Sequence, residues 1–490
     1  MHDEEGAIRG RSTSQTVGLI LGPSLAGLML IAGGPDDLDP IAWRTAAVGV
    51  LMATWWATEA IPIAATALLP IVLFPWLGIG SIQEATAPYS NKVIYLFLGG
   101  FVLAFAMQRW NLHKRIALNV LRVAGGDGRS LVGGFMLASA LLSMWVMNTS
   151  TTMMLLPIAV SIIAVINSSI SGLGDRERND FQHALLLGVA YGATIGGIST
   201  LVGTAPNAML AAFMQDNYDM QIDFARWMLI GVPLSAALLP LAWIALTRFV
   251  FKVGFHTTGE GRAELERMRQ ELGPITTPEK RVAMLFVAMA TLWITRPLIA
   301  DIPGLSAIDD SGIAIAGAVA LFIMLSGDKR DPMLLRWEYA ERLPWGVLLL
   351  FGGGLSLAGA VQRTGLAQWI GASLETLGTL PLFALVLVAA AMIIFLTELT
   401  SNIATTATFL PVVGAVAIEA GIDPIVLTVP ITLAASCAFM LPVATPPNAI
   451  VFGSGMLRIP RMARAGFALN LIAILLVSLV AVLIAPHVLG

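Results

Sequence analysis

The sequence predicts an all-α polytopic membrane protein with about 11 transmembrane helices and two re-entrant helical hairpins. Three observations support this fold class. The chain is 57% hydrophobic and only 12% charged, whereas soluble domains carry about a quarter charged residues. Apolar runs of membrane-spanning length recur along its 490 residues. Two further apolar regions are each interrupted at the middle by a short polar turn.

A spanning helix needs about 20 mostly apolar residues, and these runs supply the predicted helices in order. They are 16–33, 42–59, 60–78, 92–108, 184–214, 227–249, 282–299, 311–326, 345–361, 424–453 and 465–486. The interrupted regions, 131–166 and 380–419, are expected to be hairpins that enter and leave on one side. The polar residues 1–15 do not resemble a cleavable signal peptide, so the first run should remain as an anchor.

Basic residues concentrate in alternate loops, which predicts the orientation because Lys and Arg favour the cytoplasmic side. The basic loops hold Arg109, Lys114, Arg115, Arg122, Arg129, Arg176, Arg178, Lys252, Arg262, Arg267, Arg269, Lys280, Arg281, Lys329, Arg330, Arg336, Arg342, Arg458, Arg461 and Arg464. The other loops are poor in these residues and often acidic, as at Asp36 and Asp37. The N-terminus is therefore expected inside and, with eleven spans, the C-terminus outside. The charged loop 250–281 is interpreted as a solvated cytoplasmic segment.

An internal repeat relates the two halves of the chain. The polar turns, in 147–157 and 398–411, contain Asn148 and Asn402, which are 254 positions apart, and Arg109 and Arg363 share that offset. Further on, 203–208 matches 444–449 at an offset of 241. The loop charges place Arg109 inside and Arg363 outside, so the copies have opposite orientations. Inverted repeats with interrupted helices place a transporter's binding site near the membrane midplane.

Four non-helical points should meet at this site: the tips near Asn148 and Asn402, and the breaks 204–207 and 445–448. Hydroxyl, amide and freed carbonyl oxygens suit a hard cation, and freed N–H groups at helix starts suit an anion. No Lys or Arg lies at any of the four points. A bound dianion therefore needs accompanying cations, and coupling to Na⁺ supplies both the charge and a driving force.

At these residues the chain resembles the divalent anion:sodium symporter family, which includes dicarboxylate, citrate and sulfate carriers. Members have Ser-Asn-Thr signatures at two hairpin tips, where this chain has Met147-Asn148-Thr149 and Ser401-Asn402-Ile403. The stretch 436–455 is similar to the bacterial dicarboxylate branch. The resemblance covers nearly the whole chain beyond residue 15.

The resemblance implies a homodimer with an elevator-type mechanism in the cell's inner (plasma) membrane. Its architecture would comprise a cytoplasmic tail, two sets of scaffold helices, two inverted repeats and a last helix. In this chain these are 1–15, 16–91, 92–226 (hairpin 131–166, broken helix 184–214), 227–344, 345–455 (hairpin 380–419, broken helix 424–453) and 465–486.

The resemblance also implies the ligands of each site by motif position. The first sodium site would use Ser143, Met147, Asn148 and Gly203, and the second Thr397, Thr400, Asn402 and Ala444, partly through backbone carbonyls. The substrate would meet Asn148, Thr149, Thr204, Asn402, Ile403, Thr445 and Pro446. Met147 replaces a serine, and a thioether is a poor ligand for a hard cation. Ile403 replaces a threonine, which makes one side of the pocket more apolar.

Three other residues receive structural interpretations. Glu398 has Met144 as its counterpart in the first copy, so a paired structural role is favoured over that of a proton carrier. Glu59 is expected at an interface turn, and Cys437 as a small core residue.

The predicted function is sodium-coupled uptake of C4-dicarboxylates such as succinate, malate or fumarate. A sulfate or other oxyanion symporter and a sodium-independent dicarboxylate exchanger remain as alternatives. An enzyme is disfavoured because the sequence has no nucleophile–base motif and its five scattered histidines have no metal-ligand spacing. A channel is disfavoured by the hairpins within the repeat. The net charge of −3 points to no nucleic-acid partner, and no cofactor is expected.

Overall fold

The computed structural model describes residues 11–123, 127–169, 174–255, 259–305, 307–329, 331–373 and 381–489. Within these residues the regular elements are helices, and β-pairing is confined to isolated bridges such as that between Leu325 and Met333. The predicted all-α class is therefore confirmed. Residues 1–10 of the predicted tail, 256–258 of the predicted loop and 380 of the second hairpin lie outside the described residues.

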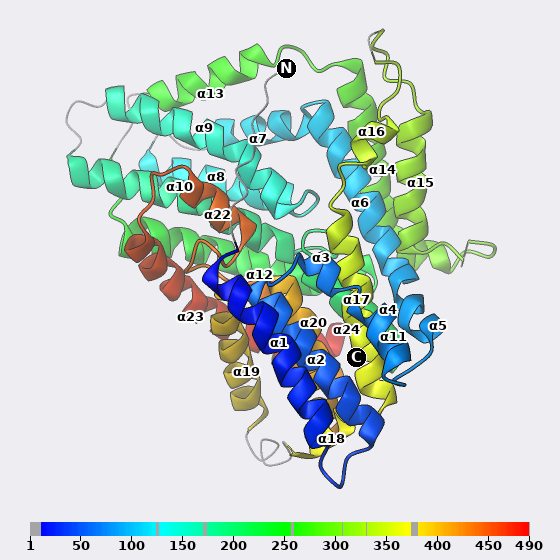
Figure 1. Cartoon of the computed structure of the whole chain (residues 1–490). Coiled ribbons are helices and arrows are strands. Elements are labelled where there is room, and N and C mark those ends of the chain that lie inside the picture. Colours follow the sequence, from blue (N-terminus) through cyan, green and yellow to red (C-terminus); the bar gives the residue numbers. More distant parts are fainter. Residues whose placement is uncertain are drawn as a thin grey trace.

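The helices fall into five consecutive groups (Figure 1). The first comprises α1 (Thr13–Ala32), α2 (Pro40–Thr58), α3 (Ile63–Thr66), α4 (Leu69–Trp76), α5 (Ile82–Thr86) and η1 (Ala87–Ser90). The second comprises α6 (Lys92–Arg109), α7 (Leu112–Val123), α8 (Gly128–Ser143), α9 (Asn148–Ser169), α10 (Asp175–Ile198) and α11 (Ala205–Tyr218).

The third group comprises α12 (Phe224–Ile244), the π-helical η2 (Ala245–Val250), α13 (Glu260–Glu271), α14 (Thr277–Ala300), α15 (Asp310–Ile323) and α16 (Trp337–Ala340). The fourth comprises α17 (Trp345–Arg363), α18 (Leu366–Ser373), α19 (Leu382–Thr397), α20 (Asn402–Glu419), α21 (Pro424–Ala435) and α22 (Pro446–Gly453). The fifth comprises α23 (Ile459–Leu483) and α24 (Ala485–Leu489).

Among the described residues, nine helices are long and apolar enough to cross a membrane. Seven coincide with predicted spans, and the other two are α9 and α20, the second arms of the predicted hairpins. The sequence prediction of about 11 included four runs outside these nine. The polytopic character is confirmed, and the reasons for the lower count are local.

Proline, helix length and polarity explain the four differences. The run 60–78 is two short helices, because Pro62 caps α3 and Pro70 begins α4. The run 311–326 is the 14-residue α15, and 424–453 is divided between α21 and α22. Helix α2 has 19 residues, which is long enough, but Arg44 lowers its mean hydropathy. The Arg44 guanidinium donates to the Leu77 carbonyl at 3.0 Å.

The second and fourth groups contain matching helices in the same order. Helices α6 and α17 end at Arg109 and Arg363, α8 and α19 end at Ser143 and Thr397, and α9 and α20 begin at Asn148 and Asn402. Each of these pairs keeps the offset of 254 found in the sequence. Helices α11 and α22 begin at Ala205 and Pro446, at the offset of 241. The repeat found in the sequence is therefore also a structural repeat, in which corresponding helices begin or end at corresponding residues.

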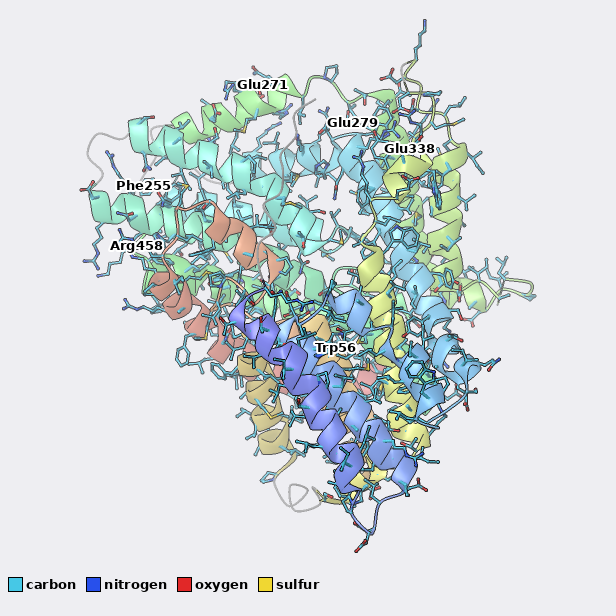
Figure 2. All side chains as sticks on the ribbon, in the orientation of Figure 1. Trp56, Phe255, Glu271, Glu279, Glu338 and Arg458 are labelled. Carbon is cyan, nitrogen blue, oxygen red and sulfur yellow. The ribbon has the colours of Figure 1, made fainter. Side chains whose placement is uncertain are left out.

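The matching helices α6 and α17 run in opposite directions. Lys92 at the start of α6 and Arg363 at the end of α17 line the same surface hollow. Arg109 at the end of α6 forms an ion pair with Asp331, which precedes α17. In Figure 1, α6 rises to α7 near the top, whereas α17 descends from α16 toward α18 at the bottom. Figure 2 shows Glu271 and Glu279 of the predicted cytoplasmic loop 250–281, and Glu338 of another basic segment, gathered at the top, whereas Arg458 of a third such segment is labelled lower, at the left.

Helix α10 lies in the interior of the second group. In its most apolar 18-residue window, 94% of the residues are buried, against 17% in α1. Glycines allow this burial, because a Cβ added at Gly192 would lie 2.6 Å from the Met136 carbonyl oxygen on α8. Such contact distances require bare backbone at the crossing. Helices α8 and α10 therefore pack as one unit.

Replacing Gly192 with Ala should lower the melting temperature of the purified protein, because the added methyl group overlaps the α8 backbone. Overpacking of this kind costs about 1–3 kcal/mol. The control is Gly27→Ala in α1, where an added Cβ meets nothing within 4 Å. Thermal unfolding in detergent measures both variants. Equal melting temperatures for the two variants would show that the α8–α10 contact accommodates the added methyl group without loss of stability.

Candidate functional site

The four predicted turns meet at a central cavity of about 640 Å³. Two walls come from the hairpin tips, and two come from the segments that join α10 to α11 and α21 to α22. The cavity lining includes every residue predicted to contact the substrate: Asn148, Thr149, Thr204, Asn402, Ile403, Thr445 and Pro446. Residues more than 250 positions apart in the sequence are thus brought to one place.

The remaining wall comes from the start of α1 and from α2, α3, α6 and α17, and its residues are apolar except for Ser12, Gln15, Thr58 and Glu59. It includes Trp56 near the end of α2, which is labelled near the centre of the molecule in Figure 2, and Phe97 and Phe101 of α6. Among the described residues lining the cavity, Glu59 is the only charged one, and no Lys or Arg is present. Glu59 occupies a left-handed turn after α2, with φ of 48°. Any anion held here relies on groups other than basic side chains.

Four helices begin at the cavity: α9, α11, α20 and α22. Thr204 and Thr445 precede α11 and α22 with extended backbone, and prolines occupy the first turns of both helices. The sequence interpretation placed these prolines inside the breaks. They lie instead where a helix needs no N–H donor and where their fixed φ favours its start. Helix N-termini carry partial positive charge and unpaired N–H groups, so the four starts together favour an anion.

Oxygen atoms surround the side chain of Asn148 at the first tip. One terminal atom of its amide lies 2.5 Å from Ser143 Oγ, 3.2 Å from the Ala193 carbonyl oxygen and 3.3 Å from that of Gly203. Ser143 is fully buried. These groups are called the first oxygen cluster. The elements that contribute are α8, α9, α10 and the segment before α11.

A matching cluster surrounds Asn402 at the second tip. One terminal atom of its amide lies 3.0 Å from Thr397 Oγ1, 3.1 Å from the Ala435 carbonyl oxygen and 3.3 Å from that of Ala444. Thr397 is fully buried and its hydroxyl also donates to Ala435, at 3.1 Å. These groups are called the second oxygen cluster. Its distances repeat those of the first cluster closely, as the internal repeat requires.

Each cluster suits two orientations of its asparagine amide. With the nitrogen turned inward, the amide donates to the neighbouring oxygens. With the oxygen turned inward, four oxygens converge without a hydrogen between most of them, which is the environment of a bound hard cation. The choice of amide orientation is an assignment that follows the partners. The residues present therefore fit an alkali cation.

Not every residue of the predicted sodium sites contributes a side chain to a cluster. The Thr400 hydroxyl donates to the Leu396 carbonyl at 3.1 Å and lies 2.7 Å from Thr405 Oγ1. The Met147 side chain packs against the hydrophobic core. Both residues line the cavity. Because their side chains are engaged elsewhere, each would offer a cation its backbone carbonyl rather than its side chain.

Sequence reasoning missed two members of the clusters, the carbonyls of Ala193 and Ala435. Alanine has no side-chain signature for a ligand, because any residue supplies the same carbonyl. The available signal was the neighbouring Gly196-Gly197 pair. A Cβ at Gly197 would collide with the Asn148 amide, so this glycine makes room for the first cluster.

Two further asparagines hold the breaks in shape. The Asn207 amide nitrogen donates to the carbonyls of Gly197, Ile198 and Thr200, at 3.3, 3.2 and 2.8 Å. Its counterpart Asn448 donates to Ala438 and Leu441, at 3.3 and 3.1 Å. Both side chains are fully buried. They satisfy carbonyls that leave the helical pattern, which any irregular backbone at membrane depth requires.

Glu398 is paired, as expected, although with backbone rather than with a cation. Its carboxylate is 3% exposed and accepts from the N–H groups of Phe439, Met440 and Leu441, at 2.8 to 3.1 Å. The Asn470 amide nitrogen on α23 donates to it at 2.7 Å. Cys437 in the same segment is a buried free cysteine, as expected.

A sequence profile described as the sodium:sulfate symporter transmembrane region matches residues 14–488. This chain belongs to the sodium:sulfate symporter family. The family resemblance inferred from the two tips is thereby confirmed, and the chain is a multi-pass membrane transporter.

Curated relatives within the sodium:sulfate symporter family are similar over nearly the full length. The sodium-dependent dicarboxylate transporter SdcS of Staphylococcus saprophyticus is 42% identical over 482 residues, which are 98% of this chain and 93% of that protein. The protein of the same name from Staphylococcus aureus strain MRSA252 is 41% identical with the same coverage.

Solved structures show the fold of this symporter at low sequence identity. MtrF of Neisseria gonorrhoeae, described as representing a class of antimetabolite efflux pumps, superposes with a TM-score of 0.58 at 14% identity, covering 93% of this chain and 96% of that one. YdaH of Alcanivorax borkumensis has the same TM-score and identity, covering 88% and 97%.

Replacing Gly197 with Ala should weaken sodium binding at the first oxygen cluster, because the methyl group displaces the Asn148 amide. Displacing a charge-assisted contact costs about 1.5–3 kcal/mol, which corresponds to a roughly tenfold or larger rise in the sodium concentration for half-maximal effect. Gly453→Ala on α22 is the matched control, since its added Cβ meets nothing within 4 Å. Sodium titration of the melting temperature reports both. Identical sodium titrations of the two variants would contradict the prediction that Gly197 makes room for sodium binding at the first oxygen cluster.

Proposed function

We propose that this chain is a secondary active transporter that imports C4-dicarboxylates together with Na⁺. The observation that carries the proposal is the pairing of two oxygen clusters with four helix starts around one cavity. The clusters suit cations, and the helix starts suit carboxylates. The names of the curated relatives, sodium-dependent dicarboxylate transporters, support the same substrate and ion.

Coupling follows from the shared asparagines. Asn148 and Asn402 each belong to an oxygen cluster through the side chain and begin a helix at the cavity through the backbone. Sodium binding turns the amide oxygen into the cluster and fixes the tip. A fixed tip holds the N–H groups of α9 and α20 toward the substrate. The positive charge of the ions also offsets a dianion that meets no Lys or Arg among the described lining residues.

The apolar wall favours a dicarboxylate over sulfate. Ile403 lines the cavity at a position where the family resemblance implies threonine in related carriers, and Trp56 and Phe97 extend the apolar surface. The methylene carbons of succinate suit this wall, whereas sulfate exposes only oxygens.

The elevator arrangement, the dimer and the orientation belong to the same proposal. The two repeats, 92–226 and 345–455, would be inverted across the membrane, with scaffold helices at 16–91 and 227–344. The opposite directions of α6 and α17 support the inversion. The alternating basic loops support a cytoplasmic N-terminus and an external C-terminus. The homodimer is carried over from the family resemblance.

Purified protein in proteoliposomes should accumulate radiolabelled succinate when a sodium gradient is directed inward, and not with an equal potassium gradient. Unlabelled malate and fumarate should compete, and sulfate should not. Liposomes without protein are the control. Succinate uptake that ignores sodium would leave the exchanger alternative, and competition by sulfate alone would leave the oxyanion symporter.

Replacing Asn402 with Ala should reduce sodium-driven succinate uptake by about tenfold or more, because one side chain links the second cluster to the second tip. The matched control is Asn179→Ala, since Asn179 is exposed at the start of α10 and only donates to the Asp175 carbonyl within the helix. Gel filtration and melting temperature verify that both variants fold. Normal uptake by a folded Asn402→Ala variant would contradict the assignment.

A further inference from the structure

The buried carboxylate of Glu398 distinguishes the two halves of the site. Oε1 accepts from Phe439 N at 2.8 Å, Met440 N at 2.9 Å and Asn470 Nδ2 at 2.7 Å. Oε2 accepts from Met440 N at 3.1 Å and Leu441 N at 3.0 Å. All five contacts come from N–H donors, which is the pattern of an ionised carboxylate. A negative charge is therefore built into the protein interior.

This charge lies within the loop that forms the second oxygen cluster. Glu398 directly follows Thr397, and the N–H groups that it binds belong to 439–441. That segment joins Ala435 to Ala444, whose carbonyls are both members of the cluster. The carboxylate thus holds the segment that connects two ligands, and it belongs to the residue that directly follows a third, Thr397.

The first oxygen cluster has no equivalent charge. Met144 stands at the position that matches Glu398. The Met144 side chain is uncharged, and its backbone carbonyl accepts a hydrogen bond from Thr200 Oγ1 at 2.5 Å. The ligands Asn148, Ser143, Ala193 and Gly203 are all neutral. Two clusters of nearly identical geometry therefore differ by one elementary charge.

The segment held by Glu398 also contacts α10, the helix that carries one member of the first cluster. Tyr191 on α10 donates its hydroxyl to the Phe439 carbonyl at 2.7 Å, and Tyr191 lies two positions before Ala193, a member of that cluster. Tyr191 is fully buried. One buried hydrogen bond therefore joins the segment between two ligands of the second cluster to the helix that carries Ala193.

We propose that Glu398 is a positioning residue that makes the second oxygen cluster the tighter of the two sodium sites, so that the first ion binds there. This inference rests on the proposed function, since it takes both clusters to bind sodium. A fixed negative charge in a poorly solvated interior attracts a nearby cation strongly. The ion at the second cluster then orders 439–441 and, through Tyr191, prepares the first cluster.

The test is sodium binding by the purified protein without substrate, followed through radiolabelled sodium and through the sodium-dependent rise in melting temperature. The native chain should show a tighter and a weaker component. Glu398→Gln keeps the side-chain length and removes the charge, so it should raise the half-saturating sodium concentration of the tighter component about tenfold or more. Glu398→Asp, which keeps the charge, should restore most of the affinity.

The repeat supplies a matched pair that does not depend on the folding of the Glu398 variants. Thr397→Ala removes a hydroxyl from the second cluster, and Ser143→Ala removes its counterpart from the first. The tighter component should disappear in Thr397→Ala and persist in Ser143→Ala. Loss of the tighter component in Ser143→Ala, or its retention in a folded Glu398→Gln variant, would overturn the inference.

The same measurements separate this inference from the proposed function. A native chain that binds no sodium contradicts the proposed coupling itself. A native chain that binds sodium equally at both clusters leaves the coupling intact and contradicts only the role of Glu398.

Discussion

Backbone that leaves the helical pattern inside a membrane must find partners for its freed N–H and C=O groups. The whole site depends on how this constraint is met. In the first break, the Asn207 amide nitrogen donates hydrogen bonds to three backbone carbonyls. In the second break, the Glu398 carboxylate accepts hydrogen bonds from three backbone N–H groups. With these groups satisfied inside the protein, the remaining carbonyls and helix starts are free to face ions and substrate.

The sequence could indicate which residues meet at the cavity because its signals were polar side chains repeated at one offset. Asn148 and Asn402 lie at matching helix starts, and the residues predicted to meet the substrate all line one cavity. The all-α class followed from the composition together with the recurring apolar runs of membrane-spanning length. Polar residues are rare in apolar runs, so their recurrence is informative about position as well as about chemistry.

What the sequence missed had no side-chain signal or depended on distant packing. Ala193 and Ala435 act through carbonyls that every residue possesses. The prolines at 206 and 446 were expected within the breaks and instead begin helices. The run 60–78 is apolar throughout, yet Pro62 and Pro70 divide it into α3 and α4. Hydropathy reports which segments avoid water, and it does not report where a helix can continue.

The two orientations of the asparagine amides have a consequence for leakage. In the proposed transport cycle, an empty carrier with both nitrogens turned inward would satisfy its own oxygens, and a carrier that holds sodium would satisfy them through the ions. A carrier that held substrate without sodium would keep its tips tied by these amides and meet the anion with no compensating charge. Slippage, in which substrate crosses alone and dissipates its gradient, is thus discouraged by hydrogen-bond chemistry at two side chains.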